Sequence, residues 1–507
     1  MPARCASLPA MLLRSAERSP DSVAIVEGSR RISYSGLWEQ IRAVAGFLAE
    51  LGVETGDRVA LFLENSAEYV AAYYGVLLSG GVVVALNTAT KARDIDTWVR
   101  HSDARLLFAD CRHPEYAAIL SRLDAGVCVI SLGGGDNMAA NHYTWELAVN
   151  SQGTRRNPDD VTDSALAAII YTSGTTGNPK GVTLTHNNLV SNTESILHYL
   201  DLKSDDSIVN VLPFFYSYGN SILHTHLACG GRIILEKSML YPAQVLNRMA
   251  EEQVSGFSGV PSTFSILLNR VDLAQFDLSN LRYMTQAGGP MAPADIHRLR
   301  SLLPDVRFYV MYGQTEASAR LSYLPPERLL DKPGSIGVAI PGVRIEIRGP
   351  DGKEVQPHVH GELCAHGENV MCGYWKDPET TRKVLRDGWL HTGDIAYRDE
   401  DGYLYIVGRA NDMIKSGAHR ISPKEIEEIV LEMDGIVEAV ALGVPDPMLG
   451  QAIKLIVVAK PGASLEAKRI QRHCRENLAS YKIPKFIEFA DTLPRTSSGK
   501  VQRFKLQ

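Results

Sequence analysis

The sequence predicts an α/β protein with a large N-terminal domain of α/β subdomains, a β-rich subdomain within it, and a small, mobile α/β C-terminal domain. Three observations predict this. Short apolar runs alternate with longer helical patterns up to residue 340, turn-rich short strands follow, and a second α/β pattern occupies the last hundred residues. A chain of 507 residues also exceeds what one hydrophobic core usually organises.

The first region repeats a strand-then-helix rhythm. VALFLE (59–64) precedes SAEYVAAYYGVLLSG (66–80), and ARLLFAD (104–110) precedes EYAAILSRL (115–123). SIVNVLP (207–213) opens another such unit. Runs of this length and composition predict parallel strands joined by crossover helices.

From Pro341 the pattern changes to short strands and turns, as in GVRIEIRGPDGKEV, GELCAHG and DGYLYIVGR, and this β-rich part closes near Gly408. Beyond it, RISPKEIEEIVLEM predicts a helix with Ser422 as N-cap, Pro423 at the first helical position and Glu425 completing a capping box. The strand-like AVALGVP and IKLIVVAK and a helix near 465–478 follow. We therefore predict an N-terminal domain over 1–408 and a C-terminal domain over 409–507.

Composition excludes several classes of protein. Lys and Arg number 52 against 58 Asp and Glu, a net charge of −6, so no bulk attraction to nucleic acid is expected. The longest apolar run, 74–86, is interrupted by Ser79, Gly80 and Gly81 and is shorter than the ~20 residues that span a bilayer. The seven cysteines include no C-x-x-C pair, which is typical of reduced thiols in a cytoplasmic protein.

The stretch YTSGTTGNPKG (171–181) lies between a strand-like and a helix-like segment. Its glycines allow backbone N–H groups to approach an anion, its hydroxyls add donors, and Lys180 adds a positive charge. It is not a Walker A motif, because Asn178 and Pro179 separate Gly177 from the lysine. The stretch predicts a polyphosphate-binding loop of another kind.

This stretch resembles the phosphate loop of the adenylate-forming (AMP-binding) superfamily, which includes acyl-CoA synthetases and other AMP-dependent acid ligases. Four later segments are similar to further signatures of that family, in the same order. They are YGQTEAS (312–318), WLHTGDIAYRDEDGYLYIVGR (389–409), SGAHRISPKEIEE (416–428) and PRTSSGK (494–500). The resemblance covers essentially the whole chain and implies the adenylate-forming enzyme fold.

The resemblance implies that a carboxylate is joined to the α-phosphate of ATP and that the acyl group then passes to a thiol. In this interpretation the hydroxyls and glycines of the loop and Lys180 bind the β- and γ-phosphates, with Thr172 also catalytic. Thr315 approaches the α-phosphate, and Glu316 holds Mg²⁺. The loop residues concerned are Thr172, Ser173, Gly174, Thr175, Thr176 and Gly177.

The resemblance also implies a nucleoside site. Tyr312 should stack on adenine, with Gly313 and Gln314 beside it and with Gly288 and Gly289 of QAGGP allowing close approach. Asp394 should accept hydrogen bonds from the ribose hydroxyls. Arg409 should lie next to the same sugar.

In the family a C-terminal lysine bridges the carboxylate and the α-phosphate, and Lys500 of SSGK matches it. Rotation about a hinge then admits the thiol. The hinge position is Asn411, where the family usually has a charged residue. Gly417 and Ala418 line the expected pantetheine tunnel, and many CoA-using members have glycine where Ala418 stands, so both CoA and an acyl-carrier protein stay open as acceptors.

The acid is predicted to be apolar or aromatic. The pocket segment LPFFYSYGNS (212–221) lacks the carboxylate that would pair with the ammonium of an amino acid. Phe215, Tyr216, Phe257 and Val260 are the predicted wall residues. Fatty, branched and aryl acids all fit this description.

We therefore predict an acyl-CoA synthetase that uses ATP, Mg²⁺ and CoA. The alternatives are a stand-alone ligase that loads an acyl-carrier protein, a luciferase-like oxygenase, and a non-catalytic adenylate-binding relative. The presence of Glu316, Asp394, Arg409 and Lys500 argues against the last of these. The isolated pair His224 and His226 lacks a third ligand at matching spacing, so no zinc site is predicted.

Overall fold

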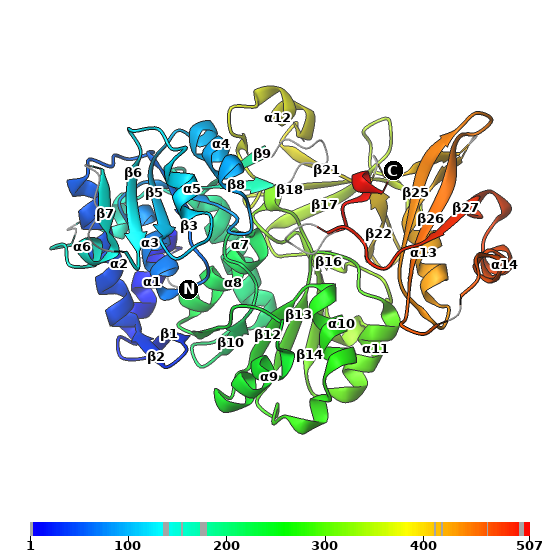
Figure 1. The fold of residues 1–507 in the computed structure, drawn as a ribbon, viewed down its shortest axis with the longest axis horizontal. Helices are drawn as coiled ribbons and strands as arrows, with labels where there is room; N and C mark the ends of the chain where they lie inside the picture. Colours follow the sequence, from blue (N-terminus) through cyan, green and yellow to red (C-terminus); the bar gives the residue numbers. More distant parts are fainter. Residues whose placement is uncertain are drawn as a thin grey trace.

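The computed structural model describes residues 4–134, 141–153, 156–172, 180–409, 412–416, 419–463, 465–495 and 501–506. Within these residues the strands form four sheets, of eight, nine, five and five strands. Figure 1 shows the blue and cyan N-terminal part beside the green part, with the orange and red C-terminal part at the right.

The eight-stranded sheet carries the predicted phosphate loop near one edge. Its order is β19 (Gly373–Tyr374), β9 (Lys180–Thr185), β8 (Leu166–Thr172), β4 (Val82–Ala85), β3 (Arg58–Phe62), β5 (Ala104–Asp110), β6 (Cys128–Leu132) and β7 (His142–Thr144). The strands from β8 to β7 are parallel, whereas β9 and β19 are added antiparallel.

The nine-stranded sheet has the order β16 (Val338–Ala339), β15 (Ser322–Leu324), β14 (Arg307–Tyr312), β13 (Tyr283–Gln286), β12 (Gly256–Gly259), β10 (Ser207–Asn210), β11 (Arg232–Leu235), β1 (Val23–Glu27) and β2 (Arg30–Ser33). From β14 to β1 the strands are parallel. β14 ends at Tyr312, so the YGQTEAS motif begins where this strand reaches the edge of the sheet.

Helices cover both faces of these two sheets, and the largest core cluster lies between the sheets. The helices contributing to it are α1 (Leu8–Arg18), α2 (Tyr34–Glu50), α3 (Ala67–Leu78), α6 (Trp145–Val149), α7 (His186–Leu200) and α8 (Ser217–Cys229). On β3, Val59 and Leu61 face this layer, while Ala60 and Phe62 face the outer helix α4. A parallel sheet buried on both faces explains why VALFLE is a continuous apolar run.

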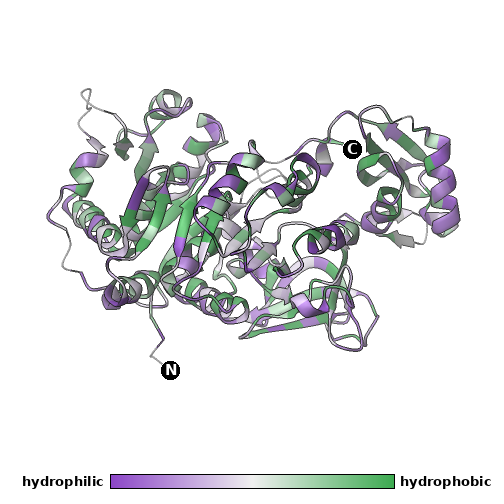
Figure 2. Ribbon diagram, turned by 90° about the horizontal axis from the view of Figure 1, so that it is seen from below, coloured by the Kyte–Doolittle hydropathy of each residue, from purple (hydrophilic) through white to green (hydrophobic). Residues whose placement is uncertain are grey.

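The outer helices complete the layers. α4 (Ala92–Ser102) and α5 (Tyr116–Leu120) pack outside the eight-stranded sheet. α9 (Pro242–Glu251), α10 (Pro261–Arg270) and α11 (Pro293–Leu302) pack outside the nine-stranded sheet. The predicted helix 115–123 is shorter than expected, because only Tyr116–Leu120 form α5. Figure 2 shows apolar strands inside and hydrophilic helix surfaces outside.

Single-turn 3₁₀ helices occur at η1 (Pro158–Asp160), η2 (Leu273–Gln275), η3 (Thr315–Ala317), η4 (Pro326–Arg328), η5 (Ser480–Lys482) and η6 (Arg503–Lys505). Of these, η3 lies inside the YGQTEAS motif. It follows β14 directly, so a strand end and a tight turn together set the position of Thr315 and Glu316.

The β-rich segment after Pro341 forms the first five-stranded sheet, as predicted. It contains β17 (Val343–Arg348), β18 (Gly361–Gly367), β21 (Trp389–Arg398), β20 (Leu385–Arg386) and β22 (Leu404–Arg409), with α12 (Pro378–Val384) before β20. All its strand pairs are antiparallel. Asp394 on β21 pairs with Arg409 on β22 in this register.

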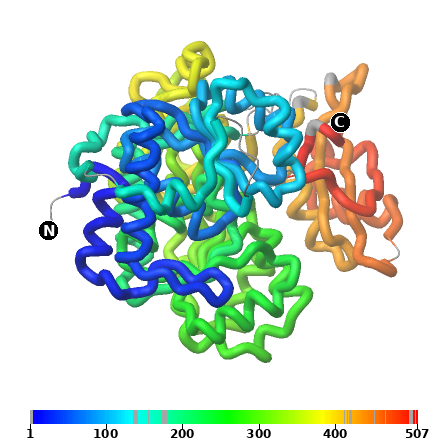
Figure 3. The backbone as a smooth tube through the Cα atoms, turned by 60° about the vertical axis from the view of Figure 1, so that its left-hand side comes forward, coloured from blue at the N-terminus to red at the C-terminus, as the bar shows by residue number. Residues whose placement is uncertain are grey.

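The last sheet is built from β24 (His419–Ile421), β23 (Ile414–Ser416), β26 (Gly450–Ala459), β25 (Ile436–Asp446) and β27 (Phe486–Phe489). α13 (Pro423–Leu431) and α14 (Ala467–Asn477) pack on it around a separate core. Figure 3 shows this orange and red part beside the rest of the chain.

The N-terminus of α13 differs from the sequence prediction in one respect. Ser422 is the N-cap and Pro423 the first helical residue, as predicted, but the Ser422 side chain makes no capping bond. Its hydroxyl donates instead to the Val407 carbonyl, and Glu425 pairs with Lys482. The prediction of a capping box was therefore wrong, because the Ser422 and Glu425 side chains both bond to residues outside α13.

A membrane span would need a long apolar helix, and none of the helices in the described ranges meets that requirement.

Candidate active site

The predicted phosphate loop lies in the sequence between β8 and β9, which pair antiparallel. Thr172 ends β8 and pairs in register with Lys180, which begins β9. The Thr172 hydroxyl donates to the Lys180 carbonyl at 3.5 Å. The loop residues Ser173, Gly174, Thr175, Thr176 and Gly177 lie outside the described residues, so their roles stay predictions.

Lys180 and Glu316 meet at one tyrosine, Tyr374 of β19. Lys180 Nζ lies 5.0 Å from the centre of the Tyr374 ring, and the Tyr374 hydroxyl donates to Glu316 Oε1 at 2.8 Å. Burial, and then the charge of Glu316, raise the pKa of Tyr374, so its hydroxyl stays protonated. Because β19 pairs with β9, Tyr374 lies near the start of β9. It thus brings the Lys180 ammonium and the Glu316 carboxylate together next to the predicted loop.

Both charged groups retain capacity for a ligand. Among the described residues, no carboxylate lies within ion-pair distance of Lys180, and no cation lies within that distance of Glu316. The Met371 N–H donates to the Glu316 carbonyl at 2.9 Å and fixes the backbone of η3. The arrangement suits a polyphosphate on Lys180 and a hard cation on the carboxylate oxygens of Glu316.

A second cluster joins the end of β14 to the β-rich sheet. The Tyr312 hydroxyl donates to Asp394 Oδ2 at 2.6 Å, and Arg409 Nε donates to Asp394 Oδ1 at 3.0 Å. Asp394 is buried, and burial together with its charge raises the pKa of Tyr312. Two donors therefore hold this carboxylate, which has further lone pairs for neighbouring hydroxyls.

The HTGD segment of β21, which carries Asp394, is itself fixed by hydrogen bonds. The Asp394 N–H donates to Thr392 Oγ1 at 3.1 Å, and the Thr392 hydroxyl donates to the Leu363 carbonyl at 2.7 Å. The Gly393 N–H donates to Glu362 Oε1 at 3.1 Å, and Gly393 has φ of 73°, a left-handed conformation that favours glycine. The sequence identified Asp394 from its motif, and these contacts explain how the motif orients it.

Three residues of the YGQTEAS segment have contacts or conformations that bear on ligand binding. Gln314 Nε2 is buried and makes no hydrogen bond within the described residues, which leaves both of its N–H donors for a ligand. Thr315 Oγ1 lies 3.3 Å from Ser217 Oγ of α8. Ser318 has φ of 65°, an uncommon value for a residue other than glycine.

Replacing Gly313 with alanine should destabilise this turn. The added Cβ would lie 1.9 Å from the Ala319 carbonyl oxygen, so the backbone must shift at a cost of about 1–3 kcal/mol. We expect a lower melting temperature and weaker ATP binding. Gly126→Ala is the matched control, because a Cβ there meets nothing within 4 Å. A Gly313→Ala protein as stable as the control would contradict the close packing.

The other predicted glycines lie at the end of β13. Gly288 has φ of 90°, and a Cβ there would be 3.3 Å from the Val260 side chain. The Gln286 side chain donates to the Gly289 carbonyl at 2.7 Å. These glycines contact the loop after β12, and their contact with adenine stays a prediction.

The predicted acid-pocket residues fall into two groups. The Tyr216 hydroxyl accepts from Asn87 at 3.3 Å, and its ring lies tilted against that of Phe215, with ring centres 4.6 Å apart. Val260 packs against the same inter-sheet core. Phe257 is fully buried on the other face, in the cluster that includes α10. Its neighbour Ser258 faces α7 and α8 instead, as the alternation of a strand requires.

Besides the loop residues, four further predicted residues fall outside the described residues: Asn411, Gly417, Ala418 and Lys500. The two histidines of α8 are described, and their ring nitrogens contact protein groups. His224 bonds Tyr74 and Asn220, and His226 bonds Tyr283 and the Ile222 carbonyl. Burial lowers the pKa of His224 to about 3 and that of His226 to about 4.

Sequence reasoning missed two partners within the site. Tyr374, which links Lys180 to Glu316, lies in CGYWKDP and gave no signal of its own. Ser217 lies in the pocket segment, but only its contact with Thr315 shows where it points. Taken together, the described groups fit a nucleoside triphosphate with a divalent cation. Lys180 is a cation for the phosphates, and Glu316 is a carboxylate for the metal. Gln314 has an unpaired amide nitrogen, and Asp394 is an oriented carboxylate for hydroxyl groups.

Comparisons with known proteins agree with this geometry. The model of the AMP-binding enzyme family matches residues 12–375, and that of the AMP-binding enzyme C-terminal domain matches 425–500. A feruloyl-CoA synthase of Amycolatopsis sp is 35% identical, with 96% of each chain covered.

Two solved structures are similar over nearly the whole chain. The anthranilate CoA ligase AuaEII, in complex with anthranoyl-AMP, is 25% identical with a TM-score of 0.91, covering 100% of this chain and 97% of that one. The O-succinylbenzoate Coenzyme A synthetase of Bacillus subtilis, in complex with ATP and magnesium ion, is 27% identical with a TM-score of 0.85, covering 98% of each. The chain therefore belongs to the AMP-binding enzyme family and has the adenylate-forming enzyme fold.

Proposed function

We propose that this protein is an ATP-dependent acid–CoA ligase. A carboxylate oxygen of the acid attacks the α-phosphorus of ATP, and the bond from that phosphorus to the pyrophosphate oxygen breaks. The thiolate of CoA then attacks the acyl carbon, and AMP leaves. The observation that carries the proposal is that one motif links the two clusters: Glu316 meets Lys180 at Tyr374, and Tyr312, four residues before Glu316, donates to Asp394.

Each group has a role in this scheme. Lys180 binds the outer phosphates, and the backbone and hydroxyls that precede it complete their cradle. Asp394, oriented by Tyr312 and Arg409, accepts hydrogen bonds from the ribose. Glu316 would hold Mg²⁺, which neutralises charge on the phosphates when bound. The relatives named for CoA ligation, ATP and magnesium support these assignments.

The two half-reactions need different groups of the C-terminal domain at the same active site. We therefore propose that this domain, from residue 409 onward, is mobile and hinged at Asn411. In the first orientation Lys500 reaches the acid and the α-phosphate. In the second, the segment with Gly417 and Ala418 forms the path for the thiol. The separate core around α13 supports a unit that moves as one body.

The experiment that tests this function is acid-dependent pyrophosphate release with Mg-ATP. A panel of fatty, branched, aryl, amino and dicarboxylic acids is measured alone, with CoA, and with a phosphopantetheinylated carrier protein. We expect release with at least one acid class and a CoA thioester as product. If the acyl group were transferred only to the carrier protein, that protein would replace CoA as the acceptor. If none of the acids caused pyrophosphate release, the proposal would be contradicted.

Asp394→Asn should weaken ATP binding. The carboxylate accepts hydrogen bonds as a charged group, and such bonds contribute about 1.5–3 kcal/mol, so the KM for ATP should rise about 10- to 100-fold. Steady-state kinetics at varied ATP check this. Asp387→Asn is the control, because Asp387 lies in an exposed turn with φ of 51°, which asparagine adopts readily. Equal KM values for both variants would remove Asp394 from the nucleotide site.

A further inference from the structure

Arg320, two residues after the YGQTEAS motif, is a buried cation with few partners. It is 3% exposed. Its Nε donates to the Met311 sulfur at 3.3 Å, one terminal nitrogen donates to the Ala319 carbonyl at 3.4 Å, and its guanidinium lies 4.1 Å from the centre of the Tyr218 ring. None of the carboxylates that the structure describes lies within ion-pair distance of it.

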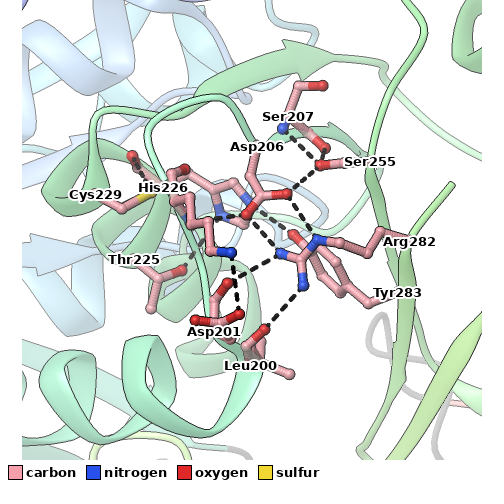
Figure 4. A network of polar contacts seen from close by, with 11 residues as sticks. Leu200, Asp201, Asp206, Ser207, Thr225, His226, Cys229, Ser255, Arg282 and Tyr283 are labelled. Carbon is pink, nitrogen blue, oxygen red and sulfur yellow. Dashed lines mark hydrogen bonds and ion pairs between the residues drawn. The ribbon is translucent and has the colours of Figure 1, made fainter. Parts of the chain in front are cut away.

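The nearby Arg282 shows what a paired arginine looks like in this protein. Its guanidinium donates to both oxygens of Asp206, at 2.5 and 3.2 Å, and to the Leu200 carbonyl at 3.2 Å (Figure 4). A buried charge without such a partner is costly, and buried charges in proteins are therefore normally paired. Arg320 departs from that rule, although it is more deeply buried than Arg282.

The side chain of Arg320 lines a small cavity beside α7, α8 and the ends of β12 to β14. The cavity measures about 10 Å³, which is the space of about one water molecule, so it would receive the end of a ligand rather than a whole one. Seven of its thirteen lining residues carry a hydroxyl group: Tyr199, Tyr218, Ser221, Thr225, Ser258, Tyr283 and Thr285.

The charge of this cavity is positive. Its lining contains no aspartate or glutamate, and its one histidine, His226, has a pKa lowered to about 4 by burial and is neutral near pH 7. The Tyr218 hydroxyl lies 2.8 Å from Thr285 Oγ1, which in turn lies 2.7 Å from Ser258 Oγ. A guanidinium beside several hydroxyls matches the recognition chemistry of a carboxylate.

The cavity and the predicted acid pocket both use residues at the start of α8. Tyr218, whose ring contacts Arg320, directly follows Ser217, whose hydroxyl lies 3.3 Å from that of Thr315. Tyr216, a predicted wall of the acid pocket, precedes them both. An acid whose reacting carboxylate lies near Thr315 would thus have its far end on the side of Tyr218 and Arg320.

We propose that the acid activated by this protein is a dicarboxylic acid whose second carboxylate pairs with Arg320. The proposal rests on the ligase function proposed above and narrows its substrate. The far carboxylate supplies the missing anionic partner and accepts hydrogen bonds from the guanidinium. A monocarboxylic acid with a methyl end would leave the guanidinium unpaired and is rejected for that reason.

The test compares chain-matched pairs of acids, each a dicarboxylic acid and the monocarboxylic acid with a methyl group in place of the second carboxylate, across short aliphatic and aryl frames. We expect the wild type to release pyrophosphate with kcat/KM at least about 30-fold higher for one diacid than for its partner. Arg320→Met should lose that preference and retain activity with the monoacid, and Arg320→Lys should lie between the two. Arg307 is an exposed arginine on β14, and Arg307→Met is the control. It should change neither the preference for the diacid nor the activity with the monoacid.

Three outcomes would overturn the proposal. One is a wild type that prefers the monoacid of every pair, which would leave the ligase function standing. Another is an Arg320→Met protein that loses activity with both acids of a pair equally. The third is a large fall in the melting temperature of Arg320→Met, since removing an unpaired buried charge should leave stability unchanged or raised. Silence with every acid, mono or di, would reject the ligase function itself and this proposal with it.

Discussion

Replacing Lys500 with alanine should lower the rate of acid-dependent pyrophosphate release about 10²- to 10³-fold, the loss seen when one charge-stabilising group is removed from a transition state. In the proposed mechanism the ammonium lies between the attacking carboxylate and the α-phosphate. Both groups are negative, so they repel each other until a cation bridges them. Single-turnover release of pyrophosphate measures the effect.

The same variant separates the two half-reactions. When supplied with the acyl-adenylate and CoA, Lys500→Ala should form the thioester at close to the wild-type rate, because the lysine serves only the first step. Lys468→Ala, an exposed lysine on α14, is the matched control and should affect neither step. Near-normal pyrophosphate release by Lys500→Ala would remove the lysine from catalysis.

Glu316→Gln should be nearly as severe. The carboxylate is oriented by the Tyr374 hydroxyl at 2.8 Å, and glutamine can keep that bond while losing the negative charge that binds Mg²⁺. We expect kcat to fall about 10²-fold, equivalent to about 3 kcal/mol, and the Mg²⁺ concentration for half-maximal rate to rise. Titration of the initial rate with Mg²⁺ at fixed ATP measures both quantities.

Two comparisons make the Glu316 result specific. Glu327→Gln removes an exposed carboxylate from η4 and should leave the Mg²⁺ dependence unchanged. Tyr374→Phe removes the hydrogen bond but keeps the charge, so its effect should be smaller than that of Glu316→Gln. An unchanged Mg²⁺ dependence in Glu316→Gln would exclude this carboxylate as the metal ligand.

Local pattern was sufficient for much of the fold. Strands such as ARLLFAD were predicted with their observed bounds, because residues 104–110 form a buried strand of a parallel sheet. The bounds of helix 115–123 were predicted less well, and the capping box of α13 was wrong because a partner distant in sequence decided it. Lys482, which pairs with Glu425, lies 57 residues further along the chain.

The candidate site, like the fold, could be predicted from local sequence only in part. Motifs identified Asp394 and Glu316, but the groups that orient them could not be read from local sequence. Tyr312 lies 82 residues before Asp394, and Tyr374 lies 58 residues after Glu316. Arg320 did leave a signal, since an arginine interrupts the otherwise small and apolar run after YGQTEAS. Its meaning depends on burial without an acidic partner, which only the three-dimensional structure shows.

The edge position of β19 has a consequence for synthesis of the chain on the ribosome. β9, which begins at Lys180, is covered on its outer side by Gly373 and Tyr374, and the Thr183 hydroxyl donates to the Gly373 carbonyl across 190 residues. At about 5–20 residues per second, the ribosome needs ~10–40 s to make that intervening stretch. During this time β9 is an open edge, available to pair with another nascent chain. Early chaperone contact with this segment would therefore protect the growing enzyme at the strand that later borders its phosphate loop.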